Sequence, residues 1–291
     1  MRLKQIIFLA TALAFLASCS TSKLITTSKT NAVNFENSGN FSEAMNAWSQ
    51  YFMQTPVEQT AGEDFAHAAE VAFKAGNNMQ AIAWFDQARY KNYADQAMYQ
   101  TLSKIYKSED NLSKELSSLE TYIEMFGKDN AEVNERLFAL YSEIGDNEKA
   151  LGYWNLMNDQ GRSDKANLVD YLLVNKALEK DVVCDSTATA LLKIDPEQTV
   201  ALDWLAKKYY WAGQNRYTSE MQNYEQNKTR KQYNILLKEL DKVTADFKKA
   251  LPYLEKLWKQ NPSKEYASYF ANIYARFGDE QKTEYYKQKM K

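Results

Sequence analysis

Few residues in this chain could bind a metal ion or take part in nucleophilic catalysis. His67 is the only histidine, and Cys19 and Cys184 are the only cysteines among 291 residues. A metal site with two histidine ligands is therefore excluded, and a Ser-His-Asp triad could use only His67. His67 stands among alanines at positions 66, 68 and 69, which favours a histidine on a helix surface or in a groove over a general base.

The carboxylates and glycines also lack the pattern of a catalytic or phosphate-binding site. Neighbouring acids such as Glu63 and Asp64 stand where helices are expected to begin, a common position for acids that cap a helix. The chain contains neither a G-x-G-x-x-G nor a P-loop sequence. We therefore predict no catalytic residue, no metal and no cofactor, and we predict that the protein is not an enzyme.

The N-terminal segment that ends in Cys19 does indicate a chemical modification. Arg2 and Lys4 precede an apolar run over residues 6–17, which ends in Leu16-Ala17-Ser18-Cys19. This segment resembles a bacterial lipoprotein signal peptide, and the resemblance implies cleavage after Ser18 and lipidation (palmitate) of Cys19. The alternative is an ordinary secretory signal with a chance cysteine. If Cys19 is acylated, Cys184 has no partner for a disulfide.

The residues after Cys19 bear on where such a lipoprotein would be sorted. Ser20 follows the cysteine directly, and the run from Ser20 to Lys23 contains no acid. By resemblance, this favours the outer membrane, on its periplasmic face. We expect residues 1–18 to be the signal peptide and residues 19–28 to be a lipidated, flexible tether.

A spacing repeated along the chain indicates how the rest of it folds. Gly76 is followed by Ala81, Phe85 and Ala88, and the same spacing returns after Gly39 and after Gly145. The pattern resembles tetratricopeptide repeats, which are pairs of antiparallel helices. The resemblance implies an all-α, right-handed solenoid of about seven helix pairs over residues 29–291. The repeats are expected near 25–58, 62–95, 96–129, 131–164, 165–198, 199–262 and 264–291.

Some repeats depart from the family pattern. The third has Asp110 and Glu115 where glycine and alanine are expected, and the fourth has Phe138 where a small residue is expected. The fifth is degenerate, and its Cys184 falls at a position that small buried residues occupy. We therefore predict that Cys184 is a packed core residue rather than a reactive thiol.

The sixth repeat contains an insertion, predicted over residues 214–249. Apolar residues continue at helical spacing through it, and it contains neither proline nor glycine. We expect two long helices that form a projecting, coiled-coil-like arm, with a turn at residues 227–229. Lys228, Arg230 and Lys231 would lie at the tip. The alternative is a disordered insertion.

Composition agrees with a helical protein that carries an uneven charge. Only nine glycines and four prolines occur in the chain. Residues 20–170 contain 13 basic and 22 acidic residues, whereas residues 171–291 contain 21 and 16. The uneven charge could orient the protein against a partner, or could reflect no more than solvated helix faces. An acidic, exported chain disfavours nucleic-acid binding.

The resemblance implies a non-enzymatic scaffold of the kind found among lipoproteins of the Bacteroidota. A groove lined by the first helix of each repeat would bind an envelope protein or peptide, and the arm would provide a second contact. The alternative function is glycan binding through surface aromatics such as Trp84 and Trp211. The groove positions implied by the family are Glu63, Glu70, Phe73, Gln100, Lys104, Lys107, Glu132 and Glu135.

Overall fold

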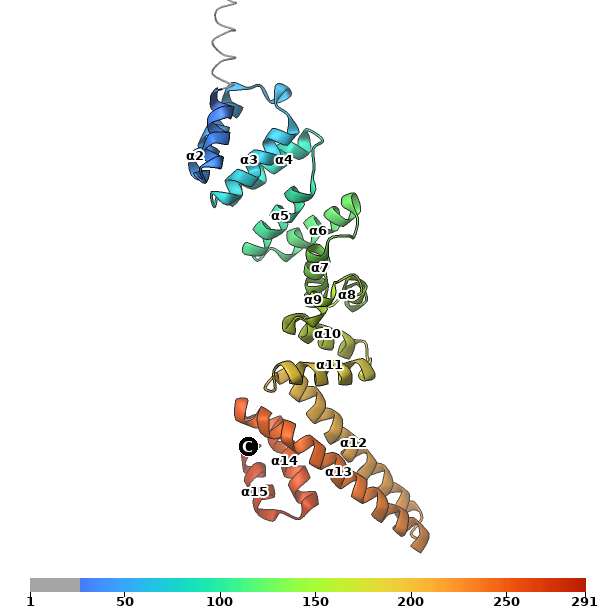
Figure 1. The fold of residues 1–291 in the computed structure, drawn as a ribbon. Helices are drawn as coiled ribbons and strands as arrows, with labels where there is room; N and C mark the ends of the chain where they lie inside the picture. Colours follow the sequence, from blue (N-terminus) through green and yellow to red (C-terminus); the bar gives the residue numbers. More distant parts are fainter. Residues whose placement is uncertain (1–26) are drawn as a thin grey trace, which may run out of the picture. The chain divides into compact units, whose positions relative to one another are not determined.

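The computed structural model describes residues 27–291, so the signal peptide, Cys19 and most of the predicted tether lie outside the described residues. The chain divides into two compact units, residues 1–133 and residues 134–291. Helices make up nearly all regular structure in the described part, and no strand occurs there (Figure 1). No helix within residues 27–291 has both the length and the apolar character needed to cross a membrane.

The first unit consists of consecutive helix pairs. Residues 27–37 are helical, and they include the last two residues of the predicted tether. The remaining elements are α2 (Phe41–Gln54), the short 3-10 helix η1 (Val57–Gln59), α3 (Gly62–Lys74), α4 (Asn78–Tyr90), α5 (Gln96–Ser108) and α6 (Leu112–Phe126).

The tight turns inside these pairs explain the repeated glycine. Gly76, between α3 and α4, has a φ of 79°, a left-handed conformation that costs glycine nothing. Asp110 stands at the equivalent turn between α5 and α6 with a φ of 52°. An aspartate tolerates this region better than most residues do. The third repeat therefore keeps the turn although it lacks the glycine.

Aromatic residues at the repeat positions form the core of the first unit. Trp48, Phe85 and Tyr122 are buried. Phe52 of α2 stacks on Phe65 of α3, with 4.4 Å between ring centroids, and so joins one helix pair to the next. Trp84, which the sequence offered as a surface aromatic, is only 7% exposed and packs edge-on against Phe52. The expectation of an exposed Trp84 is therefore wrong, because the residue is part of this core.

The second unit contains most of α7 (Ala131–Ile144), followed by α8 (Asn147–Trp154) and the five-residue α9 (Asp159–Ser163). The next helices are α10 (Lys165–Ala177), α11 (Asp181–Ile194), α12 (Thr199–Gln226), α13 (Arg230–Gln260), α14 (Lys264–Phe277) and α15 (Glu280–Lys289). Cys184 of α11 is completely buried, and its burial raises the pKa of the thiol. This agrees with the predicted core role.

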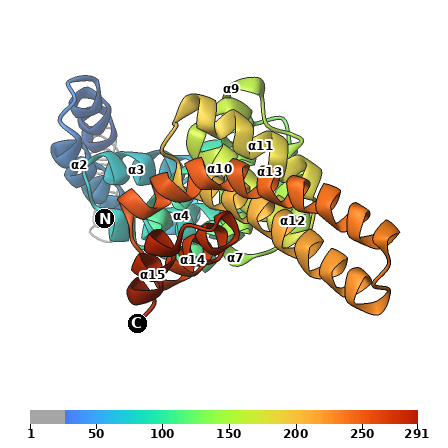
Figure 2. The same ribbon diagram turned by 90° about the horizontal axis from the view of Figure 1, so that it is seen from below.

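The two longest helices, α12 and α13, flank the sequence predicted as an insertion. They contain 28 and 31 residues and run side by side in both views (Figures 1 and 2). Asn227 ends α12, and the Thr229 hydroxyl accepts a hydrogen bond from the Gln232 amide at the start of α13. The helical period of the insertion and its turn at 227–229 are both present in the structure.

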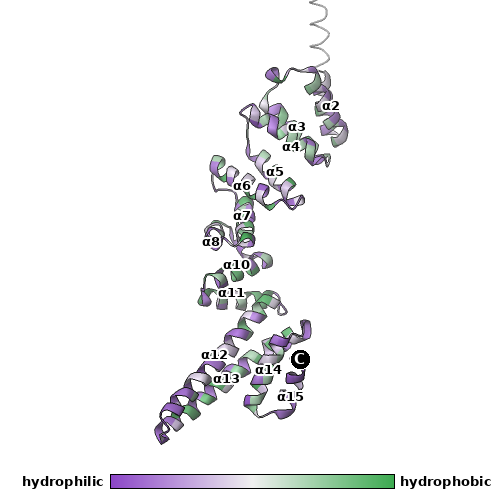
Figure 3. Cartoon of the chain, turned by 180° about the vertical axis from the view of Figure 1, so that it is seen from behind, coloured by the Kyte–Doolittle hydropathy of each residue, from purple (hydrophilic) through white to green (hydrophobic). Residues whose placement is uncertain are grey.

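Specific contacts hold α12 against α13. Gly213 lies against the Phe247 ring so closely that an added Cβ would stand 2.9 Å from two ring carbons. One turn further along α12, Arg216 forms ion pairs with Glu239 at 3.1 Å and with Asp246 at 3.4 Å. Both helices carry mostly hydrophilic residues with hydrophobic ones among them (Figure 3). The hairpin is therefore a packed pair of helices rather than an unstructured insertion, and Val243 and Phe247 of α13 are buried in it.

Candidate functional site

The candidate groove residues of the second repeat lie on one face of α3. Glu63, His67 and Glu70 are spaced by four and three residues, which places them on the same side of a helix. The opposite side of α3 carries the buried Phe65, Ala68, Ala69 and Ala72. Burial of that apolar side therefore directs the two glutamates and the histidine away from the core.

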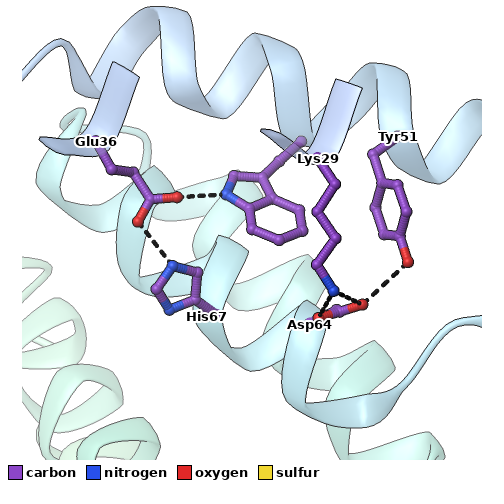
Figure 4. A network of polar contacts seen from close by, with 6 residues as sticks. Lys29, Glu36, Tyr51, Asp64 and His67 are labelled. Carbon is purple, nitrogen blue, oxygen red and sulfur yellow. Dashed lines mark hydrogen bonds and ion pairs between the residues drawn. The ribbon is translucent and has the colours of Figure 1, made fainter. Parts of the chain in front are cut away.

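One hydrogen bond, from His67 to Glu36, joins this face to the preceding helix pair, and a second one within that pair holds Glu36 (Figure 4). The Trp48 indole Nε1 donates to Glu36 Oε1 at 2.7 Å, and His67 Nε2 lies 2.7 Å from Glu36 Oε2. The Trp48 and His67 rings also meet edge to face, with centroids 5.6 Å apart. His67 is thus held between a carboxylate and an indole, which gives the lone histidine a structural role.

A second cluster surrounds Asp64 at the start of α3. The Lys29 ammonium donates to both carboxylate oxygens, at 2.6 and 2.8 Å, and the Tyr51 hydroxyl donates to Oδ2 at 3.0 Å. Burial, together with the Asp64 carboxylate, raises the pKa of Tyr51 to about 12. Tyr51 therefore stays a neutral hydrogen-bond donor at physiological pH.

Both clusters border a pocket of about 350 Å³, which we call the α3 pocket. Glu63 and Glu70 lie on its wall, so two of the predicted groove residues do line a concave site. Its other lining residues are Lys29, Val33, Trp48, Asp64, Ala66, His67, Tyr93, Asp95 and Ala97.

Glu70 is the lining residue with an unsatisfied polar atom. Its Oε1 atom is buried and has no hydrogen-bond partner in the described part of the chain. Burial raises the pKa of Glu70, whereas the Thr101 hydroxyl and the charges of Lys74 and Lys104 lower it. The carboxylate is thus partly desolvated without a cation bonded to it.

The remaining predicted groove residues lie in different surroundings. Phe73 and Gln100 are half-buried, whereas Lys104, Lys107 and Glu132 are exposed. Glu135 accepts a hydrogen bond from Asn167 Nδ2 at 2.7 Å, and the same amide also donates to the Gly161 carbonyl at 2.9 Å. Glu135 therefore braces α7 against the next helix pair.

The sequence reasoning overlooked Lys29, Val33 and Glu36. The family's groove positions, applied to the first repeat as they were to the second, select these three residues. Tyr93 and Asp95 lie before α5 and have no such signature. The Tyr93 hydroxyl donates to Asp95 at 3.0 Å, and Asp95 caps α5 by accepting from the Met98 amide at 2.8 Å.

A second pocket, which we call the α12 pocket, occupies about 360 Å³ in the second unit. Trp211 is 47% exposed and contributes to its wall. Asp185 fixes the neighbouring Trp204 by accepting from its indole Nε1 at 3.0 Å, and it also pairs with Lys208. The other lining residues are Lys176, Asp181, Lys207, Ala212 and Asn215.

A third pocket, of about 560 Å³, lies between α7 and α10 in the second unit. Ala139, Ser142 and Leu173 are on its wall at positions that the family pattern assigns to the groove. Burial and the nearby Glu143 raise the pKa of Asp170, which also lines it. All three pockets thus use residues from the first helices of the pairs.

The predicted tip residues stand at the turn between α12 and α13. Lys228 pairs with Glu225 at 2.7 Å. Arg230 and Lys231 begin α13 and are exposed, and neither has an ion pair within residues 27–291. Across those same residues, no group of three or more His, Cys, Asp or Glu side chains is arranged to hold a metal ion.

Comparisons with known proteins relate the fold to that of tetratricopeptide repeat proteins. No protein-family model and no curated protein matches the sequence. Among solved structures, the chain is similar to YrrB, a tetratricopeptide repeat protein with an unusual peptide-binding site. The identity is 14%, the match covers 65% of this chain and 96% of that one, and the TM-score is 0.50.

Repeat proteins from two bacteria also match, at lower TM-scores. One, from Bacteroides fragilis, is 19% identical over 91% of this chain and 98% of its own, with a TM-score of 0.38. The other, from Parabacteroides merdae, is 11% identical over 93% and 92%, with a TM-score of 0.46. The helix pairs, their left-handed turns and the similarity to YrrB together show that this chain has the all-α, tetratricopeptide-type solenoid fold.

Proposed function

We propose that this protein is a non-enzymatic scaffold that holds a peptide segment of a partner protein against the first helices of its repeats. The α3 pocket is the observation that supports this most directly. It lies at the family's groove positions and combines aromatic, acidic and basic side chains. The fold is that of YrrB, a protein described as having a peptide-binding site.

Site-specific photo-crosslinking in cells that make the protein tests this role. We would place a benzophenone amino acid at Phe73 or at Lys104 on the groove side, and at the exposed Glu124 of α6 as the control. We expect the groove positions to capture one partner protein that the control position does not. Equal capture at all three positions, or none at the groove, would contradict a groove-bound peptide.

We further propose that the scaffold is a lipoprotein of the bacterial envelope, anchored through acylated Cys19 at the periplasmic face of the outer membrane. The sequence Leu16-Ala17-Ser18-Cys19 after an apolar run supports this proposal. Several acyl chains on one residue would bind a bilayer stably, at about 0.8 kcal/mol for each buried methylene.

The anchor is tested with Cys19→Ser. We expect the variant to lose palmitate labelling and to appear in the soluble fraction, whereas Cys184→Ser, the matched control, should keep both the label and the membrane association. Added protease should spare the wild-type protein on intact cells and cleave it after the outer membrane is opened. A labelled Cys19→Ser protein would refute lipidation at this residue.

In this proposal the α12–α13 hairpin is a second contact surface. Val243 and Phe247 fall within the predicted insertion but are buried in the core of the second unit. The deletion that tests the arm should therefore spare them. Removing residues 218–226 and 230–238, and keeping the turn at 227–229, shortens both helices equally and leaves Arg216 opposite Glu239.

We expect the shortened protein to keep its helical circular dichroism per residue and to lose recovery of a partner from the native envelope. A double substitution of Arg230 and Lys231 by serine should give a partial loss if the basic tip contributes. Unchanged recovery of the partner with the shortened hairpin would refute the role of the arm.

Glycan binding is the second candidate function, and the α12 pocket is the observation that favours it. An exposed tryptophan beside carboxylate, amide and ammonium groups can stack on a sugar ring while the polar groups bond to its hydroxyls. A glycan array with Trp211→Ala tests this, with the equally exposed Tyr285→Ala as the control. Specific binding that disappears only with Trp211→Ala would favour this function over the scaffold.

A further inference from the structure

The α3 pocket has an unequal balance of charge. Four carboxylates line it, from Glu63, Asp64, Glu70 and Asp95, against the single ammonium of Lys29 and the imidazole of His67. Lys29 is committed to Asp64, with both contacts under 3 Å, and His67 is committed to Glu36. Both basic side chains on the pocket wall are therefore already bonded to carboxylates of the chain.

Two of the four carboxylates are already satisfied by the chain. Asp64 accepts from Lys29 and Tyr51. Asp95 accepts from the Tyr93 hydroxyl and from the Met98 amide. Glu63 and Glu70 remain: Glu63 is exposed and has no ion pair among the described residues, and Glu70 carries the buried oxygen without a partner.

A buried carboxylate oxygen without a donor is unfavourable, and its presence on a pocket wall points to a donor supplied from outside. The last torsion of a glutamate side chain is soft, so Glu70 can turn either oxygen toward the pocket. Tyr93, an aromatic residue on the pocket wall that is only partly buried, can contact the aliphatic stem of a long cationic side chain, as such residues often do.

We propose that the α3 pocket binds a lysine or arginine side chain of the bound peptide, with Glu70 as its main carboxylate partner and Glu63 at the rim. This inference rests on the peptide-binding function proposed above and adds the chemistry that the pocket selects. Charge complementarity favours a cationic side chain over an acidic or an apolar one. An acidic peptide residue would face four carboxylates, and an apolar one would leave the Glu70 oxygen without a donor.

The test uses the full-length protein and libraries of short fluorescent peptides. One central position is fixed as Lys, Arg, Glu or Ala, and the other positions are equal mixtures. We expect the wild-type protein to bind the Lys and Arg libraries more tightly than the Ala library and to bind the Glu library most weakly. Glu70→Gln should weaken binding of the Lys and Arg libraries by about tenfold, the range for a hydrogen bond to a charged group.

Two further variants separate the pocket from general charge effects. Glu63→Gln should reduce the Lys and Arg preference less than Glu70→Gln does, because Glu63 is solvated. Glu124→Gln, an exposed acid on α6, should change nothing. If Glu70→Gln and Glu124→Gln behave alike, the assignment of Glu70 is overturned.

The outcomes also separate this inference from the proposed function. Peptide binding without preference for Lys or Arg would leave the scaffold function standing and overturn the cation pocket. Absence of binding to any library, together with absence of groove crosslinks in cells, would overturn both. Preference for Lys and Arg that is lost with Glu70→Gln supports both.

Discussion

At the scale of single residues, Glu70 shows how a partly buried carboxylate can cost stability. Burial raises the pKa of Glu70 above the ordinary glutamate value of 4.5, because a charged carboxylate is poorly solvated there. The folded chain therefore binds this proton more tightly than the unfolded chain does. The free energy of unfolding should fall as pH rises through the raised pKa, so the cost is present above that pKa.

The corresponding prediction concerns thermal stability. Glu70→Gln cannot ionise, so we expect its melting temperature to exceed that of the wild-type protein at neutral pH. The difference should shrink as the pH falls to about 3, where the wild-type carboxyl is largely protonated in both states. Differential scanning calorimetry at the two pH values measures this, with Glu124→Gln as the control. A Glu70→Gln protein that melts earlier at neutral pH would mean that the carboxylate makes a stabilising contact.

The same residue separates what the sequence could predict from what it could not. Family positions placed Glu63 and Glu70 on the groove side because helix periodicity is local information. The clusters at Glu36 and Asp64 depend on residues that are 12 to 35 positions apart. No spacing rule encodes such contacts. For the same reason the sequence could not show that the Glu135 carboxylate accepts a hydrogen bond from Asn167.

At the scale of secondary-structure elements, the α12–α13 packing depends on a residue without a side chain. An alanine Cβ at Gly213 would meet the Phe247 ring at 2.9 Å and the Val243 carbonyl at 3.3 Å. Phe247 is completely buried and has little room to move. Gly213→Ala should therefore destabilise the protein by about 1–3 kcal/mol, as overpacked cores do, in spite of the better helix propensity of alanine.

Gly152 in α8 is the matched control. An added Cβ there meets no atom within 4 Å, so Gly152→Ala should stabilise the protein by up to about 1 kcal/mol. Urea unfolding followed by circular dichroism measures both variants. If both variants changed the free energy of unfolding in the same direction, helix propensity rather than the Gly213–Phe247 contact would govern these positions.

Most of the elements were predictable because each repeat contains its own signals. Apolar spacing marked the helices, and glycines marked most of the left-handed turns inside the pairs, although Asp110 and Glu179 occupy that position in two of them. The exception is the second helix of the fourth repeat, where α8 ends after eight residues. Trp154 at its end stacks on Tyr171 of α10, with 3.9 Å between centroids. This contact with the following helix pair, together with the Asn158 cap of α9, sets the shape of the segment.

At the scale of the whole molecule, a repeat protein derives its stability from contacts between neighbours in the sequence. Damage to one part should therefore stay local. We expect Gly213→Ala to speed amide hydrogen exchange in α12, α13 and α14, which share one apolar cluster. Exchange in α3, α4 and α5 should match the wild-type protein. Faster exchange throughout residues 27–291 would instead indicate a single cooperative unit.

The rate at which Cys184 is labelled can report local opening of the second unit. Cys184 is completely buried, and burial keeps its thiol protonated and poorly reactive. In a protein whose Cys19 is acylated or replaced by serine, it is the only free thiol in the sequence. The rate at which a thiol reagent labels it would then time the opening of α11 from its neighbours. A ligand bound nearby should slow that labelling, so the native sequence already carries a reporter of occupancy that needs no engineered label.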